Sequence, residues 1–117
     1  MTHQFRARLT NGELLVGTMV TLSSPEVAEL LAGIGFDWLF LDAEHSTFEA
    51  RTIQALLQGA GADTPCVVRV SSREEVPIKK ALDIGAAGII APQVNSVEAA
   101  ERVVRFSKYS PEGARAV

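Results

Sequence analysis

The chain has 117 residues, of which 47% are hydrophobic and 21% are charged, and its formal net charge is −3. This balance is typical of one small soluble domain and gives no basic patch that would favour nucleic acid or an anionic membrane. No apolar run approaches the roughly 18 residues that a membrane helix needs. The single cysteine, Cys66, excludes an internal disulfide, so we expect a cytoplasmic protein in which Cys66 is a small buried side chain.

A short helix is predicted over residues 4–9, and it is followed by four repeats of one unit: an apolar extended run, a turn and an amphipathic helix. The extended runs are short and rich in Val, Ile, Leu and Phe, with little alternation of polar residues. This pattern favours strands that are buried on both faces, as in parallel sheets. The predicted strands are Leu14–Leu22, Asp37–Asp42, Pro65–Val70 and Gly88–Val94.

Each predicted strand is followed by signals for the start or end of a helix. Serines and asparagines suit the cap position, prolines suit the first turn, and glycines end helices. A serine followed three residues later by a glutamate also has the spacing of a capping box. In chain order, the signals are Ser23–Glu26, Ser46 with Glu49, Pro77 ahead of Gly85, and Asn95 or Ser96.

Four βα units in series predict an α/β fold in which parallel strands are joined by right-handed crossovers. Two architectures satisfy this prediction. One is a small open sheet with helices on both faces, and the other is half of an eight-fold βα barrel, since a complete barrel takes about 250 residues. Composition and periodicity do not distinguish them, and in either case we expect residues 1–117 to form a single domain.

Polar residues gather where two of the predicted strands end, which is where ligands bind in both architectures. Asp42, Glu44 and His45 follow the second strand, and Arg69 ends the third. An arginine in an apolar strand needs a partner, because its charge is not relieved by deprotonation. Arg69 therefore has two interpretations: it binds the carboxylate of a substrate through paired hydrogen bonds, or it forms a structural ion pair with Asp42 or Glu44.

His45 also has two interpretations, a general base or a histidine of the loop that precedes a helix. A histidine base needs an orienting carboxylate, and Asp83, late in the third long helix, is a candidate. The alternative for Asp83 is plain solvent exposure. Strand alternation places Trp38, Phe40 and Asp42 on one face of the sheet.

These residues resemble a known family, the class II pyruvate aldolases of the HpcH/HpaI type. The resemblance covers residues 17–115 almost without gaps, and its most specific element is the Asp-x-Glu-His sequence at residues 42–45. The segments that carry it are Val27–Trp38, Leu41–Ser46, Val67–Val70, Ile78–Ala86, Ile89–Val94 and Lys108–Arg115.

The resemblance implies the N-terminal half of a (β/α)8 TIM barrel. It also implies a reversible aldol reaction in which a pyruvate enolate and an aldehyde form a 4-hydroxy-2-oxo acid. By position, His45 resembles the catalytic base and Asp83 its orienting partner. Arg69 resembles the residue that binds pyruvate and stabilises the enolate, while Asp42 and Glu44 would line the substrate site. Small-molecule substrates and a homo-oligomer are the implied partners, with no nucleic acid or membrane.

A divalent metal ion (Mg, Mn or Co) is the cofactor that the resemblance implies. The family's ligands follow strands five and six, so we expect them beyond residue 117 and expect no metal ligand in this chain. The chain departs from the family pattern at Met19 and Gln93, where aromatic and apolar residues are usual. We expect a piece of a longer aldolase that is active only in complete form. The alternatives are a non-catalytic half-barrel that serves assembly or binding, and a lyase acting on acyl-CoA esters.

Overall fold

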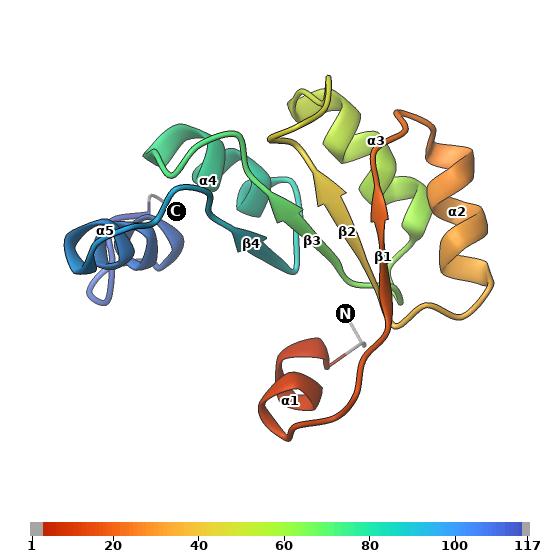
Figure 1. Cartoon of the computed structure of the whole chain (residues 1–117), viewed down its shortest axis with the longest axis horizontal. Helices are drawn as coiled ribbons and strands as arrows, with labels where there is room; N and C mark the ends of the chain where they lie inside the picture. The colour runs from red at the N-terminus through yellow and green to blue at the C-terminus, as the bar shows by residue number, and fades with distance from the viewer. Residues whose placement is uncertain (1–3, 116–117) are drawn as a thin grey trace.

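A computed structural model describes residues 4–115 and shows a four-stranded parallel sheet with helices between the strands (Figure 1). The predicted α/β fold of parallel βα units is therefore confirmed. The strands are β1 (Gly17–Val20), β2 (Trp38–Asp42), β3 (Cys66–Arg69) and β4 (Gly88–Ile90). The helices are α1 (Phe5–Thr10), α2 (Pro25–Gly33), α3 (Ala50–Ala60), α4 (Glu75–Asp83) and α5 (Val97–Ser107).

The strand order decides between the two predicted architectures. The order in the sheet is β1-β2-β3-β4, and each strand pairs in parallel with the next one along the chain. Right-handed crossovers that always advance in the same direction place their helices on the same face, whereas a doubly wound sheet reverses direction to cover both faces. The sheet therefore has the topology of a barrel segment, and the open sheet with helices on both faces is wrong.

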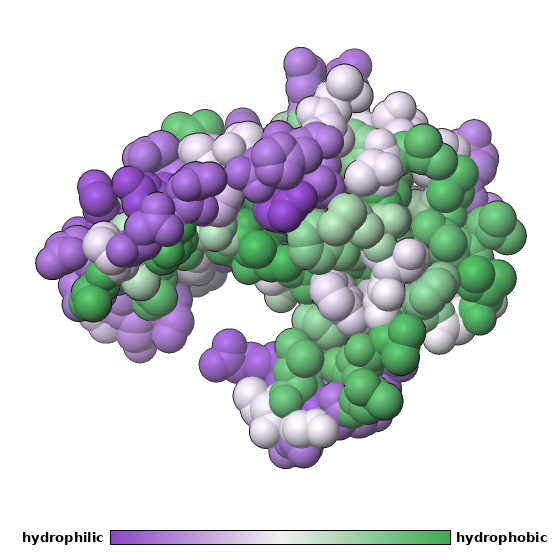
Figure 2. Space-filling model, in the orientation of Figure 1, coloured by the Kyte–Doolittle hydropathy of each residue, from purple (hydrophilic) through white to green (hydrophobic). Residues whose placement is uncertain are grey.

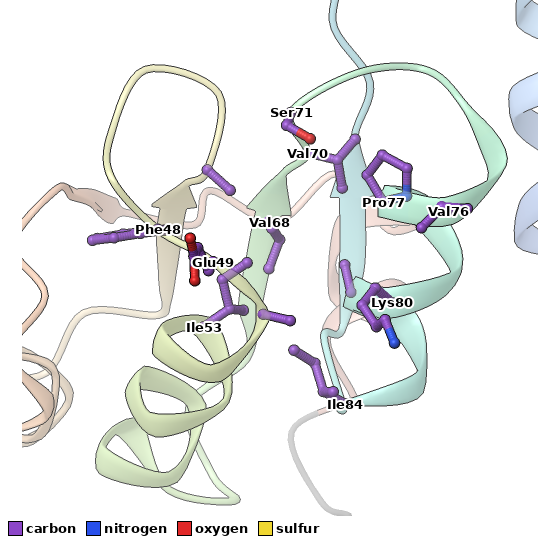
Figure 3. A pocket seen from close by; sticks show the side chains of 13 residues that line it. Phe48, Glu49, Ile53, Val68, Val70, Ser71, Val76, Pro77, Lys80 and Ile84 are labelled. Carbon is purple, nitrogen blue, oxygen red and sulfur yellow. The ribbon is translucent and has the colours of Figure 1, made fainter.

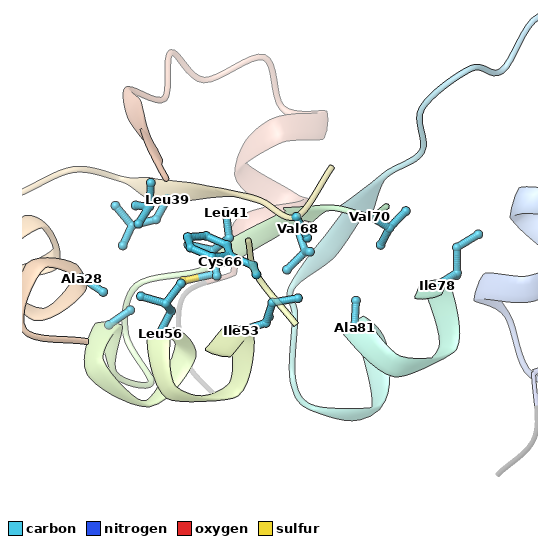
Figure 4. Close-up of a cluster of buried hydrophobic side chains, with 14 residues drawn as sticks. Ala28, Leu39, Leu41, Ile53, Leu56, Cys66, Val68, Val70, Ile78 and Ala81 are labelled. Atoms are coloured by element: carbon cyan, nitrogen blue, oxygen red, sulfur yellow. The ribbon is translucent and has the colours of Figure 1, made fainter. Parts of the chain in front are cut away.

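The hydrophobic core lies between the outer face of the sheet and helices α2, α3 and α4 (Figure 4). Leu39 and Leu41 of β2 are fully buried on this face, together with alternate residues of β3. Cys66 is among them, and burial raises the pKa of its thiol to about 12, as expected for a small apolar side chain. The fully buried large side chains are Leu39, Leu41, Leu56, Ile78, Val68 and Val70.

Helix α1 lies near the amino ends of the strands, below the sheet in Figure 1. The Arg8 guanidinium donates a 3.1 Å hydrogen bond to the Asp37 carboxylate, which also accepts the backbone N–H of Val16 at 2.9 Å. The Phe5 ring lies 6.1 Å from that of Trp38. Figure 2 shows apolar side chains on the molecular surface in the region of α1. The predicted helix over residues 4–9 is thus confirmed within one residue.

Two helix caps that the sequence predicted are formed. The Ser24 hydroxyl accepts the backbone N–H of Val27 at 3.3 Å, and the Ser96 hydroxyl accepts that of Ala99 at 3.1 Å. Pro77 lies in the first turn of α4, as predicted. Gly85 follows that helix with φ of 111°, a conformation that favours glycine.

The predicted capping box of Ser46 and Glu49 is wrong. Helix α3 begins at Ala50, later than predicted, and its cap residue Glu49 makes no side-chain cap bond. The Ser46 hydroxyl instead accepts the backbone N–H of Phe48 at 3.1 Å and donates to the carbonyl of Asp42. Ser46 therefore shapes the turn after β2, because a serine hydroxyl bonds nearby backbone as readily in a turn as at a cap.

Strands β1 and β4 are shorter than the predicted runs Leu14–Leu22 and Gly88–Val94. Leu14 is 86% exposed and Leu22 is 60% exposed, so the ends of the first run are apolar without being buried. Apolar composition predicts burial only where a neighbouring element covers the residue. Across residues 4–115, no helix combines the length and apolarity needed to span a membrane.

Gly17 allows close packing of the Trp38 ring, and its replacement tests this contact. A Cβ atom at Gly17 would lie 2.5 Å from atoms of that ring. We expect Gly17→Ala to lower the free energy of unfolding by about 1–3 kcal/mol, because the ring must move. Gly33→Ala is the matched control, since a Cβ there meets nothing within 4 Å. Urea unfolding measures both, and equal midpoints for the two variants would contradict the packing.

Candidate active site

Asp42 closes the turn that follows β2. Its side chain is only 3% exposed, and its Oδ1 accepts the backbone N–H groups of Glu44 at 3.0 Å and His45 at 3.1 Å. An aspartate that bonds the backbone two and three residues ahead forms an Asx-type turn. The abrupt change from an apolar strand to three ionisable residues therefore has a local cause: the first of them folds the chain around its own carboxylate.

Arg69 is held by the same carboxylate. Asp42 and Arg69 are register partners on neighbouring strands. The guanidinium donates from Nη2 to Oδ2 at 2.8 Å and from Nε to Oδ1 at 3.2 Å, and Nε lies 3.4 Å from a carboxylate oxygen of Glu44. These contacts realise the predicted structural ion pair with both candidate partners. They also leave a donor free, because Nη1 of Arg69 has no hydrogen-bond partner within the described part of the chain.

The ion pair shifts the titration of both partners. The Arg69 guanidinium, by donating hydrogen bonds to the carboxylate, is the largest cause that lowers the pKa of Asp42 to about 2. The backbone N–H groups of His45 and Glu44 lower it further, while burial opposes the shift. The hydrogen bonds to Asp42 in turn raise the pKa of Arg69. Both groups are therefore ionised at neutral pH, and the site presents a fixed cation.

His45 lies at the surface beside this pair. Its side chain is 69% exposed, and its Nε2 lies 3.3 Å from a carboxylate oxygen of Glu44. The same Glu44 oxygen lies 3.4 Å from Nε of Arg69, so Glu44 joins the histidine to the arginine. The structure thus brings together four of the five predicted site residues at the carboxyl edge of β2 and β3.

Asp83, the fifth predicted site residue, lies elsewhere. Its carboxylate pairs with Lys79 at 3.1 Å and Arg115 at 2.9 Å, and the hydrogen bond from Arg115 is the largest cause of its lowered pKa. The backbone N–H of Ala87 donates a 2.8 Å hydrogen bond to the carbonyl of Cys66, which places the end of α4 beside the start of β3. This is the amino edge of the sheet, because α4 runs back along it. The predicted pairing of Asp83 with His45 is therefore not formed within the chain.

Phe40 is a neighbour of the site that sequence reasoning did not assign. The Cζ atom of Arg69 lies over its ring, 5.3 Å from the centroid. Strand alternation predicted that Phe40 shares a face with Asp42, and this was the only sequence signal for its place near the site. Alternation along β2 does not predict that Arg69 of β3 lies over the Phe40 ring. Of the two departures from the family pattern, Met19 is the register partner of Phe40, and Gln93 follows β4 with φ of 58°.

The described residues do not fit a metal site. Within residues 4–115, no group of three or more His, Cys, Asp or Glu side chains is placed to hold an ion. Asp42 and Glu44 are the carboxylates nearest the site, and both are engaged by Arg69. The implied divalent ion therefore has no ligand set in this part of the structure.

A groove of about 310 Å³ lies between α3 and α4, on the helix-covered face of the sheet, which is the face opposite Phe40 and Asp42 (Figure 3). Its walls are mainly apolar, with Glu49, Ser71 and Lys80 as the polar exceptions. None of the four clustered site residues lines it. The groove is thus separate from the ionic cluster. The remaining lining residues are Ala43, Phe48, Ala50, Ile53, Val68, Val70, Val76, Pro77, Ala81 and Ile84.

Fold and site together define an α/β barrel-type protein with a fixed arginine and an exposed histidine at the carboxyl edge of its strands, which is where barrel enzymes bind substrates. Residues 16–117 match the family described as HpcH/HpaI aldolase/citrate lyase. The chain belongs to this family, and the predicted half of a (β/α)8 TIM barrel is confirmed.

The relatives are similar to this chain over almost all of its length. A 4-hydroxy-2-oxovalerate aldolase of Novosphingobium aromaticivorans is 38% identical over 115 residues, which are 97% of this chain and 44% of that protein. A 4-hydroxy-2-oxo-heptane-1,7-dioate aldolase of Escherichia coli is 40% identical, over 100% and 45%. The crystal structure of a family protein from Burkholderia cenocepacia J2315 matches with a TM-score of 0.90 at 33% identity, over 99% and 48%. The chain therefore spans less than half the length of these relatives.

The buried ion pair makes the stability of the chain depend on pH. The pKa of Asp42 is depressed in the folded state, so its contribution is present above the unfolded value near 4 and is lost as the pH falls through about 2. We expect Asp42→Asn to be less stable than the wild type by about 2 kcal/mol at pH 7, with the difference shrinking between pH 4 and pH 2. Urea unfolding across this range measures it. A difference that stays constant down to pH 2 would contradict the assigned pair.

Proposed function

We propose that this chain supplies the pyruvate-binding part of a carbon–carbon lyase, an aldolase that forms and cleaves 4-hydroxy-2-oxo acids. The observation that carries the proposal is the Arg69 guanidinium, fixed by Asp42 at the carboxyl edge of the sheet with Nη1 free and His45 alongside. Two relatives, named 4-hydroxy-2-oxovalerate aldolase and 4-hydroxy-2-oxo-heptane-1,7-dioate aldolase, support the substrate class.

The proposed chemistry uses the cation and the histidine in different roles. Pyruvate carries a carboxylate and an adjacent carbonyl, and a guanidinium donor can bind both oxygens. When a proton leaves the methyl group, negative charge develops on the carbonyl oxygen, and a fixed cation stabilises it. His45 is the proposed base, because its side chain is exposed and contacts the same Glu44 carboxylate oxygen as Arg69 does. The enolate then attacks the aldehyde carbon to form the new carbon–carbon bond, and the proton held by His45 is returned to the former aldehyde oxygen, which gives the 4-hydroxy-2-oxo acid.

The proposed assembly is a homo-oligomer acting on small molecules, pyruvate and an aldehyde. Asp83 enters the proposal only through a second copy of the chain, because within one chain it lies at the amino edge of the sheet, paired with Arg115. Asp42 and Glu44 are proposed to line the substrate site beside Arg69, which both of them contact.

Proton exchange of pyruvate tests the assignment. In a chimaera, this chain replaces the matched 45% of the Escherichia coli aldolase, and loss of the pyruvate methyl signal in D2O is followed by NMR. We expect Arg69→Lys to slow exchange by about 10²–10³-fold, because a lysine cannot keep the paired geometry. We expect His45→Ala to slow it by about 10²–10⁴-fold.

The matched control for Arg69→Lys is Arg102→Lys, which changes an exposed arginine on α5 and is expected to leave exchange unchanged. If both site variants exchange pyruvate as fast as the parent chimaera, the catalytic assignment is wrong. If the parent chimaera itself shows no exchange, the assembly alternative is favoured over catalysis.

We also propose that the reaction needs a divalent ion whose ligands come from outside the described residues. Treating the chimaera with EDTA is expected to abolish exchange, and Mg, Mn or Co is expected to restore it. Isothermal titration of the isolated chain with the same ions is the control, because the described residues offer no group of three ligands and no tight binding is expected. Exchange that persists unchanged in EDTA would refute the metal requirement.

A further inference from the structure

Aromatic side chains form a continuous column from α1 to the candidate active site. The Phe5 ring lies 6.1 Å from the Trp38 ring, and the Trp38 ring lies 6.1 Å from the Phe40 ring. The Arg69 guanidinium completes the column, with Cζ 5.3 Å from the centroid of Phe40. Distances of this size are those of packed aromatic pairs and of cation–π contacts.

The lower part of the column has little freedom to move. Phe5 is 8% exposed, and the space beside the Trp38 ring is filled so closely that a Cβ atom on Gly17 would lie 2.5 Å from it. Helix α1 is itself tied to the start of β2 by the 3.1 Å hydrogen bond from Arg8 to Asp37. Phe40 therefore packs against a Trp38 ring that is itself closely packed.

Asp42 by itself does not fix every degree of freedom of the guanidinium. Its two oxygens hold Nε and Nη2 of Arg69, which defines one edge of the planar group. The plane can still rotate about that edge, and such a rotation would move the free Nη1. A ring against one face of the guanidinium opposes the rotation, because the cation is attracted to the face of the π system.

We propose that Phe40 is a positioning residue that fixes the plane of the Arg69 guanidinium and so the direction of Nη1. The contact between ring and guanidinium stands independently of activity. Its consequence for pyruvate binding rests on the function proposed above.

The contact is tested by NMR of the free chain, with the guanidinium signals of Arg69 assigned from their loss in Arg69→Lys. Protons near a ring face are shifted by its ring current, so we expect Phe40→Leu to abolish the shift and Phe40→Tyr to retain it. Phe48→Leu is the matched control, because it removes a buried aromatic ring that packs in the core on the other face of the sheet. Arg69 signals that are unchanged in Phe40→Leu would overturn the proposal whatever the activity.

The positioning role is tested by pyruvate exchange in the chimaera. We expect Phe40→Leu to slow exchange by about 2- to 30-fold, and Phe40→Tyr to restore it. In the double variant with Arg69→Lys, removing the ring is expected to cause no further loss, because Phe40 acts only through Arg69. The positioning role would be overturned if Phe40→Leu slowed exchange by the same factor in the parent chimaera and in the Arg69→Lys variant. It would also be overturned if Phe40→Leu left exchange at the parent rate. Unchanged exchange in Arg69→Lys alone would instead refute the proposed function and leave the NMR result to decide the contact.

Discussion

The buried carboxylate of Asp42 is the interaction on which the site depends. It accepts two backbone N–H groups of the turn after β2 and two guanidinium N–H groups of Arg69. A carboxylate that is almost fully buried is tolerated because each of these donors stabilises its charge. One side chain therefore ends β2, shapes the turn that carries Glu44 and the exposed His45, and holds the cation of the neighbouring strand.

The two edges of the sheet are used differently. At the carboxyl edge, Arg69 keeps a free donor beside an exposed histidine. At the amino edge, the charged residues are committed to holding elements together: Asp37 ties α1 to β2, and Asp83 ties α4 to the segment around Arg115. This division is the one expected of βα barrels, where chemistry gathers at the carboxyl ends and stability at the amino ends. The aromatic column joins the two edges, because it runs from Phe5 beneath the sheet to Arg69.

The sequence predicted four of the five site residues at one edge for a physical reason: parallel strands all end on the same side, so residues that close successive strands become neighbours. Helix α4 runs in the opposite direction, because the chain must return to the amino edge before β4 can begin. Asp83 follows that helix to the opposite edge. Its predicted pairing with His45 rested on the need of a histidine base for a carboxylate and on the resemblance, and neither specifies where the end of α4 lies. Ser46 was misassigned because a serine three residues before a glutamate has the same spacing in a turn as in a capping box.

The sequence by itself determined what acts over short distances along the chain. Apolar runs specified buried parallel strands, alternation specified which residues of β2 share a face, and Ser24 and Ser96 capped their helices as predicted. Only the tertiary structure decided that helices cover one face, that Asp42 and Arg69, 27 residues apart, form a paired contact, and that Asp83 binds a partner 32 residues away. The reason is geometric. Caps and alternation depend on spacings of two to three residues, whereas these contacts depend on how whole βα units are stacked.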